Sequence, residues 1–318
     1  MPGLLLAAGS AVSPAVAHGQ GGIDPRIAPR AAELIRTGER QVATDMLGGY
    51  LATAHEDGAA WLQLGRLYLF NARDWHALHV GEPDAALYLE FAAAALDQSG
   101  RLVLDSGTVY RALVEVERAT LVLEQDGWAL TLQLFGRRVL PALPPAVREL
   151  GENLLASCPS GGVLLTGGDT ELVATWYAAL DRRQPDVVIP IRSDMYATDA
   201  RYRDRIAALL GVDPRLPLRD ALAAAATRRP VCISPSADEA AVPVATWRTH
   251  RLARVSIGDV PADAALSFTA LAVQERSGGG AWLPETREVY ERAATRNPDL
   301  CPALRQALVG TPPAACRP

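Results

Sequence analysis

Residues 161–196 read GGVLLTGGDTELVATWYAALDRRQPDVVIPIRSDMY, and this stretch decides the fold of the second half of the chain. An apolar, β-prone run at 162–165 enters a polar corner at 166–170, and an amphipathic helix is expected over 171–182. A second buried strand is expected at 186–191. A strand, a glycine corner and a helix in this order predict the opening of a βα unit.

The residues after this unit repeat the alternation of helices and strands. The further expected elements are helices at 199–210 and 219–226, strands at 230–234 and 252–257, a glycine-rich connection at 277–280, and helices at 285–295 and 302–308. Strands that alternate with helices favour a parallel sheet. We therefore expect a small, mainly parallel α/β domain with C-terminal helices over 151–318.

The first half has the pattern of an array of helices. Upstream of a proline-rich hinge at 141–145, apolar residues recur at helical spacing over 29–136. The segment WLQLGRLY, residues 61–68, carries Trp, Leu, Gly and Tyr at the signature positions of a first tetratricopeptide helix, where Gly65 lets the partner helix pack closely. The other expected parts are a loop at 71–83, a partner helix at 84–97 with Phe91 and Ala94 in its core, a preceding unit at 31–51 that turns at Gly38, and a helix at 108–124. The predicted fold class is thus α + α/β, with a tetratricopeptide-like array of two or three units over 26–140 before the α/β domain.

Two roles fit such an array. Each unit leaves an apolar face uncovered, so neighbouring units must stack, and stacking creates a groove that often holds a peptide or another domain. Alternatively, the array only packs against the second half of the chain. Both interpretations stay open, and Trp75 and Trp128 are expected in the core rather than in a ligand cage.

Polar residues follow the expected strands of the second half. In open α/β sheets, ligands bind outside the carboxyl ends of the strands. The residues expected at this edge are Gly167, Gly168, Asp169, Thr170, Arg192, Ser193, Asp194, Ser234 and Ser236. Backbone N–H groups after Gly168 favour an anion whereas Asp169 opposes one, so a hydroxyl-rich ligand such as a sugar suits the edge better than pyrophosphate. The alternative is that Asp169 or Thr170 only caps the helix and the glycines only shape the turn.

Complete catalytic motifs are missing from the sequence. Neither a dinucleotide-binding glycine motif, nor a P-loop, nor a nucleophile elbow occurs, so we expect no cofactor. Asp169 and Asp194 are the candidates for an acid/base pair, but two carboxylates at neighbouring strand ends are a common arrangement. We therefore expect a binding role ahead of catalysis.

Charge and residue usage exclude several classes of function. All 31 basic residues of the 318 are arginine, which removes lysine-dependent covalent chemistry. The formal net charge of -5 leaves no general basic field for a nucleic-acid partner. His76 and His79 are spaced to share a helix face, but no third ligand stands near them in the sequence, so no metal site is expected.

The N-terminus resembles an export signal over residues 1–17. Residues 4–17 form an apolar run of small residues that ends in Ala-Val-Ala, the form cut by signal peptidases. No positively charged segment precedes this run. Either the start codon is assigned too far downstream, or the segment is not a signal. We expect an exported, periplasmic or extracellular protein, with a cytoplasmic one as the alternative. No later stretch has the length and apolarity of a membrane span, so the mature chain is expected to lack one.

Cysteine usage agrees with an oxidising compartment. Cys301 and Cys316 bracket a short C-terminal segment and are expected to form a disulfide. Cys158 and Cys232 lie beside or within expected strands, where buried thiols are the simpler interpretation.

The opening stretch resembles a segment of the extracytoplasmic C-terminal part of multispanning protein O-mannosyltransferase-like membrane proteins, which also carry tetratricopeptide repeats. The matching positions are Leu165, Gly168, Asp169, Trp176, Tyr177, Arg183, Asp186, Val187, Ile189 and Ser193. The similarity covers residues 151–256, but two asparagines of that family are replaced here, one by Thr170 and one by Pro190 or Ile191, and its membrane helices are absent. The resemblance implies an exported interaction or scaffold protein that recognises a protein or a glycan and associates with a membrane glycosyltransferase. The alternative is a glycan-modifying or transferase-associated enzyme that uses the Asp169 region.

Overall fold

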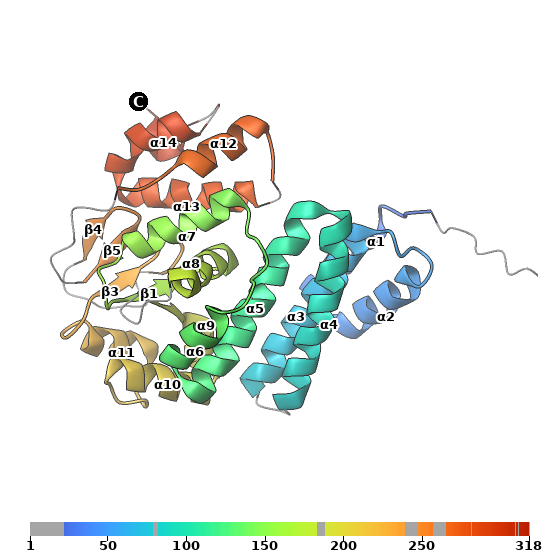
Figure 1. Cartoon of the computed structure of the whole chain (residues 1–318), viewed down its shortest axis with the longest axis horizontal. Coiled ribbons are helices and arrows are strands. Elements are labelled where there is room, and N and C mark those ends of the chain that lie inside the picture. The colour runs from blue at the N-terminus through green and yellow to red at the C-terminus, as the bar shows by residue number, and fades with distance from the viewer. Residues whose placement is uncertain are drawn as a thin grey trace, which may run out of the picture.

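The structure, a computed structural model, describes residues 22–78, 82–182, 188–238, 247–256, 265–280, 282–308, 310 and 312–317. The expected export signal, His79 and the beginning of the strand expected at 186–191 lie outside these residues. Figure 1 shows the chain as a row of helices beside a small sheet that is itself covered by helices. Among the described residues, no helix is both long enough and apolar enough to span a membrane.

The first half is helical, as expected. Its helices are α1 (Ile27–Arg36), α2 (Arg40–Leu51), α3 (Gly58–Leu78), α4 (Glu82–Leu102), α5 (Leu104–Asp126) and α6 (Trp128–Phe135). Gly38, with a φ of +84°, makes the expected turn between α1 and α2. The loop expected at 71–83 is wrong, because α3 continues to Leu78. The buried side chains of Ala72 and His76 explain why the helix continues. The hydrogen-bond partner of His76 lies far away in the sequence, on α5.

The contact between α3 and α4 confirms one detail of the expected array and corrects another. A Cβ on Gly65 would lie 2.5 Å from Cγ of Leu96, so this glycine does permit a close crossing of the two helices. Phe91 and Ala94, expected in the core, are exposed instead. The buried face of α4 is the one that carries Ala92 and Leu96. Tetratricopeptide-type packing therefore stays a prediction.

The second half contains a five-stranded sheet. Its helices and strands are α7 (Pro145–Ala156), β1 (Val163–Thr166), α8 (Asp169–Arg182), β2 (Ile189–Arg192), α9 (Ser193–Thr198), α10 (Ala200–Leu210), α11 (Leu218–Ala225), β3 (Val231–Ile233), β4 (Arg248–His250), β5 (Ala253–Val255), α12 (Thr269–Ser277), α13 (Leu283–Arg296) and α14 (Cys301–Ala307), with short 3-10 turns at Pro298–Leu300 and Ala314–Cys316. The strand order is β2-β1-β3-β5-β4. In Figure 1 the strands lie between α7, α8 and α13 on one side and α10 and α11 on the other.

The sheet is mixed rather than mainly parallel. Strands β1, β2 and β3 run parallel, with Val163 opposite both Ile189 and Val231. The strand expected at 252–257 is β5, and it pairs antiparallel with β3 and with β4. The two residues between β4 and β5 include Arg251 at a φ of +53°, and so short a connection joins only antiparallel strands.

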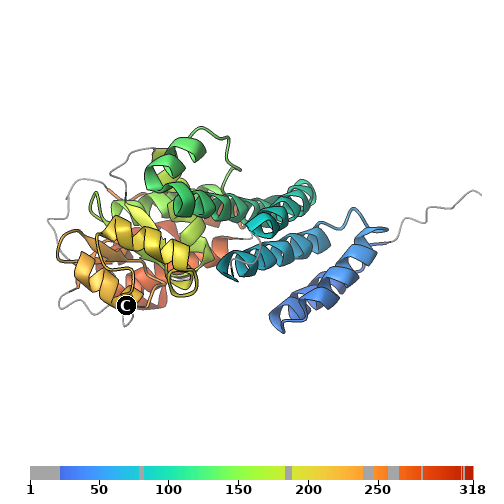
Figure 2. The same cartoon turned by 90° about the horizontal axis from the view of Figure 1, so that it is seen from below.

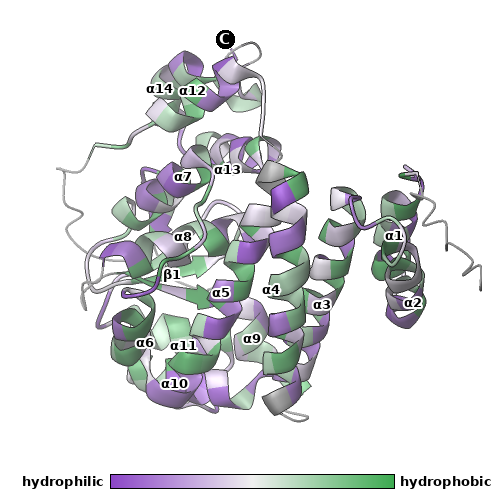
Figure 3. Ribbon diagram, turned by 45° about the vertical axis from the view of Figure 1, so that its right-hand side comes forward, coloured by the Kyte–Doolittle hydropathy of each residue, from purple (hydrophilic) through white to green (hydrophobic). Residues whose placement is uncertain are grey.

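One apolar core joins the two halves of the chain. It runs without interruption from Leu69 on α3, through α4–α8 and the sheet, to Cys316, while a smaller cluster holds α1 and α2 against α3 and α4. Trp128 is buried against Trp176, as expected of a core residue, whereas Trp75 is half-buried beside Tyr88. In Figure 2, α1 and α2 lie farthest from the sheet. Figure 3 shows apolar residues concentrated where α5 and α8 approach β1. The helices of the first half thus pack directly against the second.

Two disulfides link the described cysteines. The expected Cys301–Cys316 bond is present. The expectation of two buried thiols is wrong, because Cys158 and Cys232 are bonded to each other. These two residues are 74 positions apart, and the fold brings the end of α7 onto β3. That proximity leaves no local trace in the sequence.

The crossing of α7 and α8 requires a residue without a side chain. A Cβ on Gly151 would lie 2.0 Å from the carbonyl oxygen of Ala174, so Gly151→Ala is expected to destabilise the protein by about 1–3 kcal/mol through overpacking. Gly48 on α2 has open space where its Cβ would stand, so Gly48→Ala should instead stabilise by about 0.5–1 kcal/mol through helix propensity. Urea denaturation of both variants measures the difference. Equal effects would contradict the close crossing.

Candidate functional site

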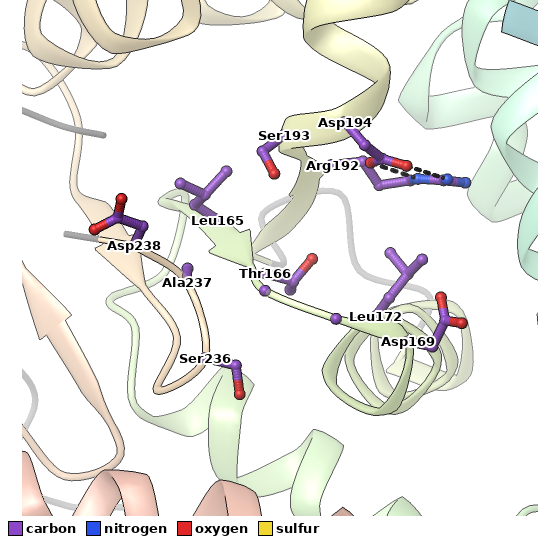
Figure 4. Close-up of a pocket in the computed structure, with 12 residues that line it drawn as sticks. Leu165, Thr166, Asp169, Leu172, Arg192, Ser193, Asp194, Ser236, Ala237 and Asp238 are labelled. Carbon is purple, nitrogen blue, oxygen red and sulfur yellow. Dashed lines mark hydrogen bonds and ion pairs between the residues drawn. The ribbon is translucent and has the colours of Figure 1, made fainter. Parts of the chain in front are cut away.

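A cleft of about 380 Å³ lies at the carboxyl ends of the three parallel strands. Its lining residues are Leu165, Thr166, Gly167, Gly168, Asp169, Leu172, Arg192, Ser193, Asp194, Ser236, Ala237 and Asp238 (Figure 4). The chain leaves β1 toward β2 on one side, while β3 lies on the other side of β1. This is the switch point at which open α/β sheets bind their ligands. The cleft therefore lies at the edge expected from the sequence.

A glycine corner joins β1 to α8, as the sequence predicted, and shapes the base of the cleft. A Cβ on Gly167 would lie 2.2 Å from the carbonyl carbon of Ser236, and Gly168 has a φ of +134°, so both positions require glycine. The buried carboxylate of Glu171 accepts hydrogen bonds from the backbone N–H groups of Gly167 and Ser236, at 2.9 Å each, and from the hydroxyl of Ser234. Glu171 thereby fixes the corner to the loop after β3.

The structure brings together most of the residues expected at this edge. Gly167, Gly168, Asp169, Arg192, Ser193, Asp194 and Ser236 all line the cleft. Thr170 lies instead beside an adjoining cavity of about 140 Å³ next to α13. Ser234 is fully buried beneath the corner, where it serves Glu171.

A chain of ion pairs connects the cleft to the helices of the first half. Arg73 on α3 donates to Asp169 (3.0 Å) and to Glu117 on α5 (2.6 Å). Arg192 donates to the other oxygen of Glu117 (2.7 Å) and to Asp194 (2.7 Å), as the dashed lines in Figure 4 mark for the last pair. The side chains of Glu117 and Arg192 are each only 3% exposed. Two cleft carboxylates are thus each positioned by an arginine, and both arginines meet at one buried glutamate.

Comparison of the chain with protein-family models, with curated proteins and with solved structures finds no match to any of them. The chemistry of the cleft therefore has to be derived from its own residues.

Electrostatics lower the pKa of two carboxylates of this network, Glu117 and Asp194. Burial acts to raise the pKa of Glu117, but the charges of Arg192 and Arg73 outweigh it and lower that pKa below its ordinary value. Burial also opposes ionisation of Asp194, yet the hydrogen bond and charge of Arg192 lower its pKa. Three carboxylates face two guanidinium groups in the network, which leaves one excess negative charge.

The contacts of Asp169 differ from those of a simple helix cap, which was the alternative interpretation. Helix α8 begins at Asp169 itself, and its carboxylate accepts hydrogen bonds from the guanidinium of Arg73. The N–H of Gly167, just before the helix, donates to Glu171 instead. Sequence reasoning missed Glu171, although an acidic residue in the first turn after a glycine corner is a recognisable signal for such a role.

A second polar cluster lies deeper between the same elements. His76 on α3 donates through Nε2 to Glu124 on α5 (2.7 Å), and the same nitrogen lies 3.4 Å from Oδ2 of Asp199, just before α10. Burial acts to lower the pKa of His76, but Glu124, with smaller contributions from Glu117 and Asp199, raises it overall. Sequence analysis expected no metal here because Glu124 and Asp199 are 48 and 123 positions away from His76. Folding brings together three side chains of metal-binding type.

Proposed function

We propose that the chain is an exported recognition protein that binds a hydroxyl-rich small molecule, such as one sugar residue, in the cleft at the carboxyl edge of its sheet. The observation that carries this proposal is the placement of Asp169 and Asp194, each held by an arginine, on the wall of that cleft. Carboxylates accept several hydrogen bonds, and a bond from a sugar hydroxyl to a charged acceptor is stronger than one between neutral groups. The hydroxyl of Ser193 and that of Ser236 add donors of their own.

Charge argues against an anionic ligand. The guanidinium groups of Arg73 and Arg192 are already engaged by carboxylates, and the network has one excess negative charge. Asp238 adds a further carboxyl group to the lining. A phosphate or a carboxylate entering the cleft would meet net repulsion, whereas a neutral polyol would not.

The same charges exclude Asp194 as the proton donor of a glycoside hydrolase. Hydrolysis by two carboxyl groups needs one of them protonated, with a raised pKa, to donate to the leaving oxygen. Asp194 has a lowered pKa because Arg192 holds it in the charged form. A residue held in this way suits hydrogen-bond acceptance and not proton donation.

Export is supported by the two disulfides, which are typical of proteins that fold in an oxidising compartment. The N-terminal apolar run at 4–17 agrees with the same localisation. Association with a membrane glycosyltransferase rests on the sequence resemblance alone.

Sugar binding can be tested by saturation-transfer NMR on the full chain with D-mannose, D-glucose and myo-inositol as probes and inorganic phosphate as the anion. We expect transfer to at least one polyol and none to phosphate. Asp194→Asn should weaken binding about 10- to 100-fold, since a hydrogen bond to a charged group contributes about 1.5–3 kcal/mol. Asp45→Asn, on α2 and away from the cleft, is the matched control and should change nothing. Absence of transfer from every polyol, or binding that survives both Asp169→Asn and Asp194→Asn, would refute the proposal.

A second function, binding of a protein partner, is favoured by the exposed apolar side chains of two helices. The helices α3 and α4 expose large apolar side chains, with Leu78 at 69%, Leu87 at 49% and Phe91 at 45% exposure. Phe91 also contacts the rings of Tyr68 and Tyr88. Exposed aromatic clusters of this kind are frequent at protein interfaces.

A further inference from the structure

The buried cluster of His76, Glu124 and Asp199 repeats the plan of the ion-pair network beside the cleft. His76 follows Arg73 by three residues on α3, and Glu124 follows Glu117 by seven on α5, so each pair shares one face of its helix. Asp199 lies in the segment that leads on from β2 through α9. The seam between the two halves of the chain therefore carries two successive polar layers.

The three side chains of the deeper layer meet at ligand distance. Nε2 of His76, Oε1 of Glu124 and a carboxylate oxygen of Asp199 all lie within 4.8 Å of one another. Ligand atoms around one tetrahedral zinc ion are about 3.3 Å apart, because each bond is about 2.0–2.2 Å long. The separations of 2.7 Å and 3.4 Å from Nε2 bracket this value, so small side-chain movements would accommodate an ion.

All three side chains of this layer are buried. The side chains are only 5%, 4% and 0% exposed, in the order His76, Glu124 and Asp199. Buried carboxylates are costly unless cations or hydrogen bonds balance their charge. Two carboxylates with a neutral histidine balance a divalent cation completely.

We propose that His76, Glu124 and Asp199 bind a divalent cation of the zinc type, which links the helices of the first half to the α/β half. One imidazole nitrogen with two carboxylate oxygens suits Zn²⁺ better than Mg²⁺, because Mg²⁺ prefers oxygen ligands and keeps several waters. A backbone hydrogen bond orients one of the ligands: Oδ1 of Asp199 accepts from the N–H of Tyr202 (3.0 Å) at the start of α10. Three protein ligands leave one position of a tetrahedral zinc ion for a water molecule. The role of the ion in linking the two halves does not depend on sugar binding in the cleft.

The test is titration of tag-free, chelator-treated full-length protein with Zn²⁺ and, separately, with Mg²⁺. Calorimetry and metal analysis should give one bound Zn²⁺ per chain, with at least about 100-fold weaker binding of Mg²⁺. The midpoint of thermal unfolding should rise with Zn²⁺ concentration, since a ligand that binds only the folded state stabilises it by mass action. All four cysteines are in disulfides, so thiolates do not compete for the ion.

Glu124→Gln retains the size of the side chain, and His76→Ala removes the nitrogen ligand. Each should lose at least about 100-fold in Zn²⁺ affinity, more than the loss typical of an outer-shell residue, and should lose the thermal shift. The matched control is His55→Ala, which removes an exposed histidine and should leave both readouts unchanged. Circular dichroism shows which variants are folded. If His76→Ala does not fold, the Zn²⁺ affinity of Glu124→Gln alone tests the proposal. An unshifted midpoint in the native protein, or full Zn²⁺ affinity in folded Glu124→Gln, would overturn the proposal.

Discussion

Glu117→Ala is expected to destabilise the protein by about 3–5 kcal/mol, because it removes the shared partner of two arginines and leaves buried charge uncompensated. Glu117 and Arg192 are almost fully buried, and Arg73 is only 18% exposed. The loss should appear as a lower free energy of unfolding in urea at pH 7. Since the network joins α3 and α5 to the start of α8 and to β2, its loss should also weaken any ligand binding in the cleft.

A matched control separates this effect from the loss of any surface charge. Glu90 pairs with Arg118 but is 69% exposed, so Glu90→Ala should cost less than about 1 kcal/mol. The pH dependence gives an independent check. The pKa of Glu117 is lowered in the folded state, so its stabilisation is present above the ordinary glutamate value of 4.5 and is lost as the pH falls below it. The gap between native protein and Glu117→Ala should therefore narrow in acid, and a gap that is constant with pH would argue against the ion-pair explanation.

Local patterns predicted the local parts of the fold. The corner at 166–170 has an apolar run before it and an amphipathic segment after it, and these signals depend only on neighbouring residues. The turn at Gly38 was predictable for the same reason. Gly65 could be singled out by its local sequence pattern, and its crossing partner Leu96 lies within the helix expected next along the chain. Properties that depend on contacts between residues far apart in the sequence could not be predicted. The rotation of α4 that exposes Phe91 depends on which neighbours cover it.

The candidate site divides in the same way. Asp169 and Asp194 could be placed at one edge because parallel strands end together. Arg73 and Glu117 could not be assigned to the site, because they stand 96 and 75 positions away from their partners Asp169 and Arg192. Their sequence surroundings are those of ordinary helix positions. An ion pair between remote helices has no periodic signal, so charged residues inside an apolar helix were the only trace.

Breaking the Cys158–Cys232 bond should destabilise the protein more than breaking Cys301–Cys316. The first bond closes a loop of 74 residues and the second one of 15, so chain entropy predicts about 4.5 and about 3 kcal/mol respectively. Urea denaturation of the paired variants Cys158→Ala with Cys232→Ala, and Cys301→Ala with Cys316→Ala, measures both losses. Native protein under a reducing agent serves as the control, because it loses the links and keeps every side-chain atom in place.

The stability lost when both disulfides are broken is relevant to the compartment in which the protein functions. Domains of ordinary stability unfold at about 5–15 kcal/mol, so loss of both links removes a large part of that stability. A chain built on such links belongs in an oxidising compartment, where they persist. If full reduction leaves the free energy of unfolding unchanged, or if the loss from the shorter loop exceeds that from the longer one, the links do not stabilise the fold by closing loops. The case for export would then rest on the N-terminal apolar run alone.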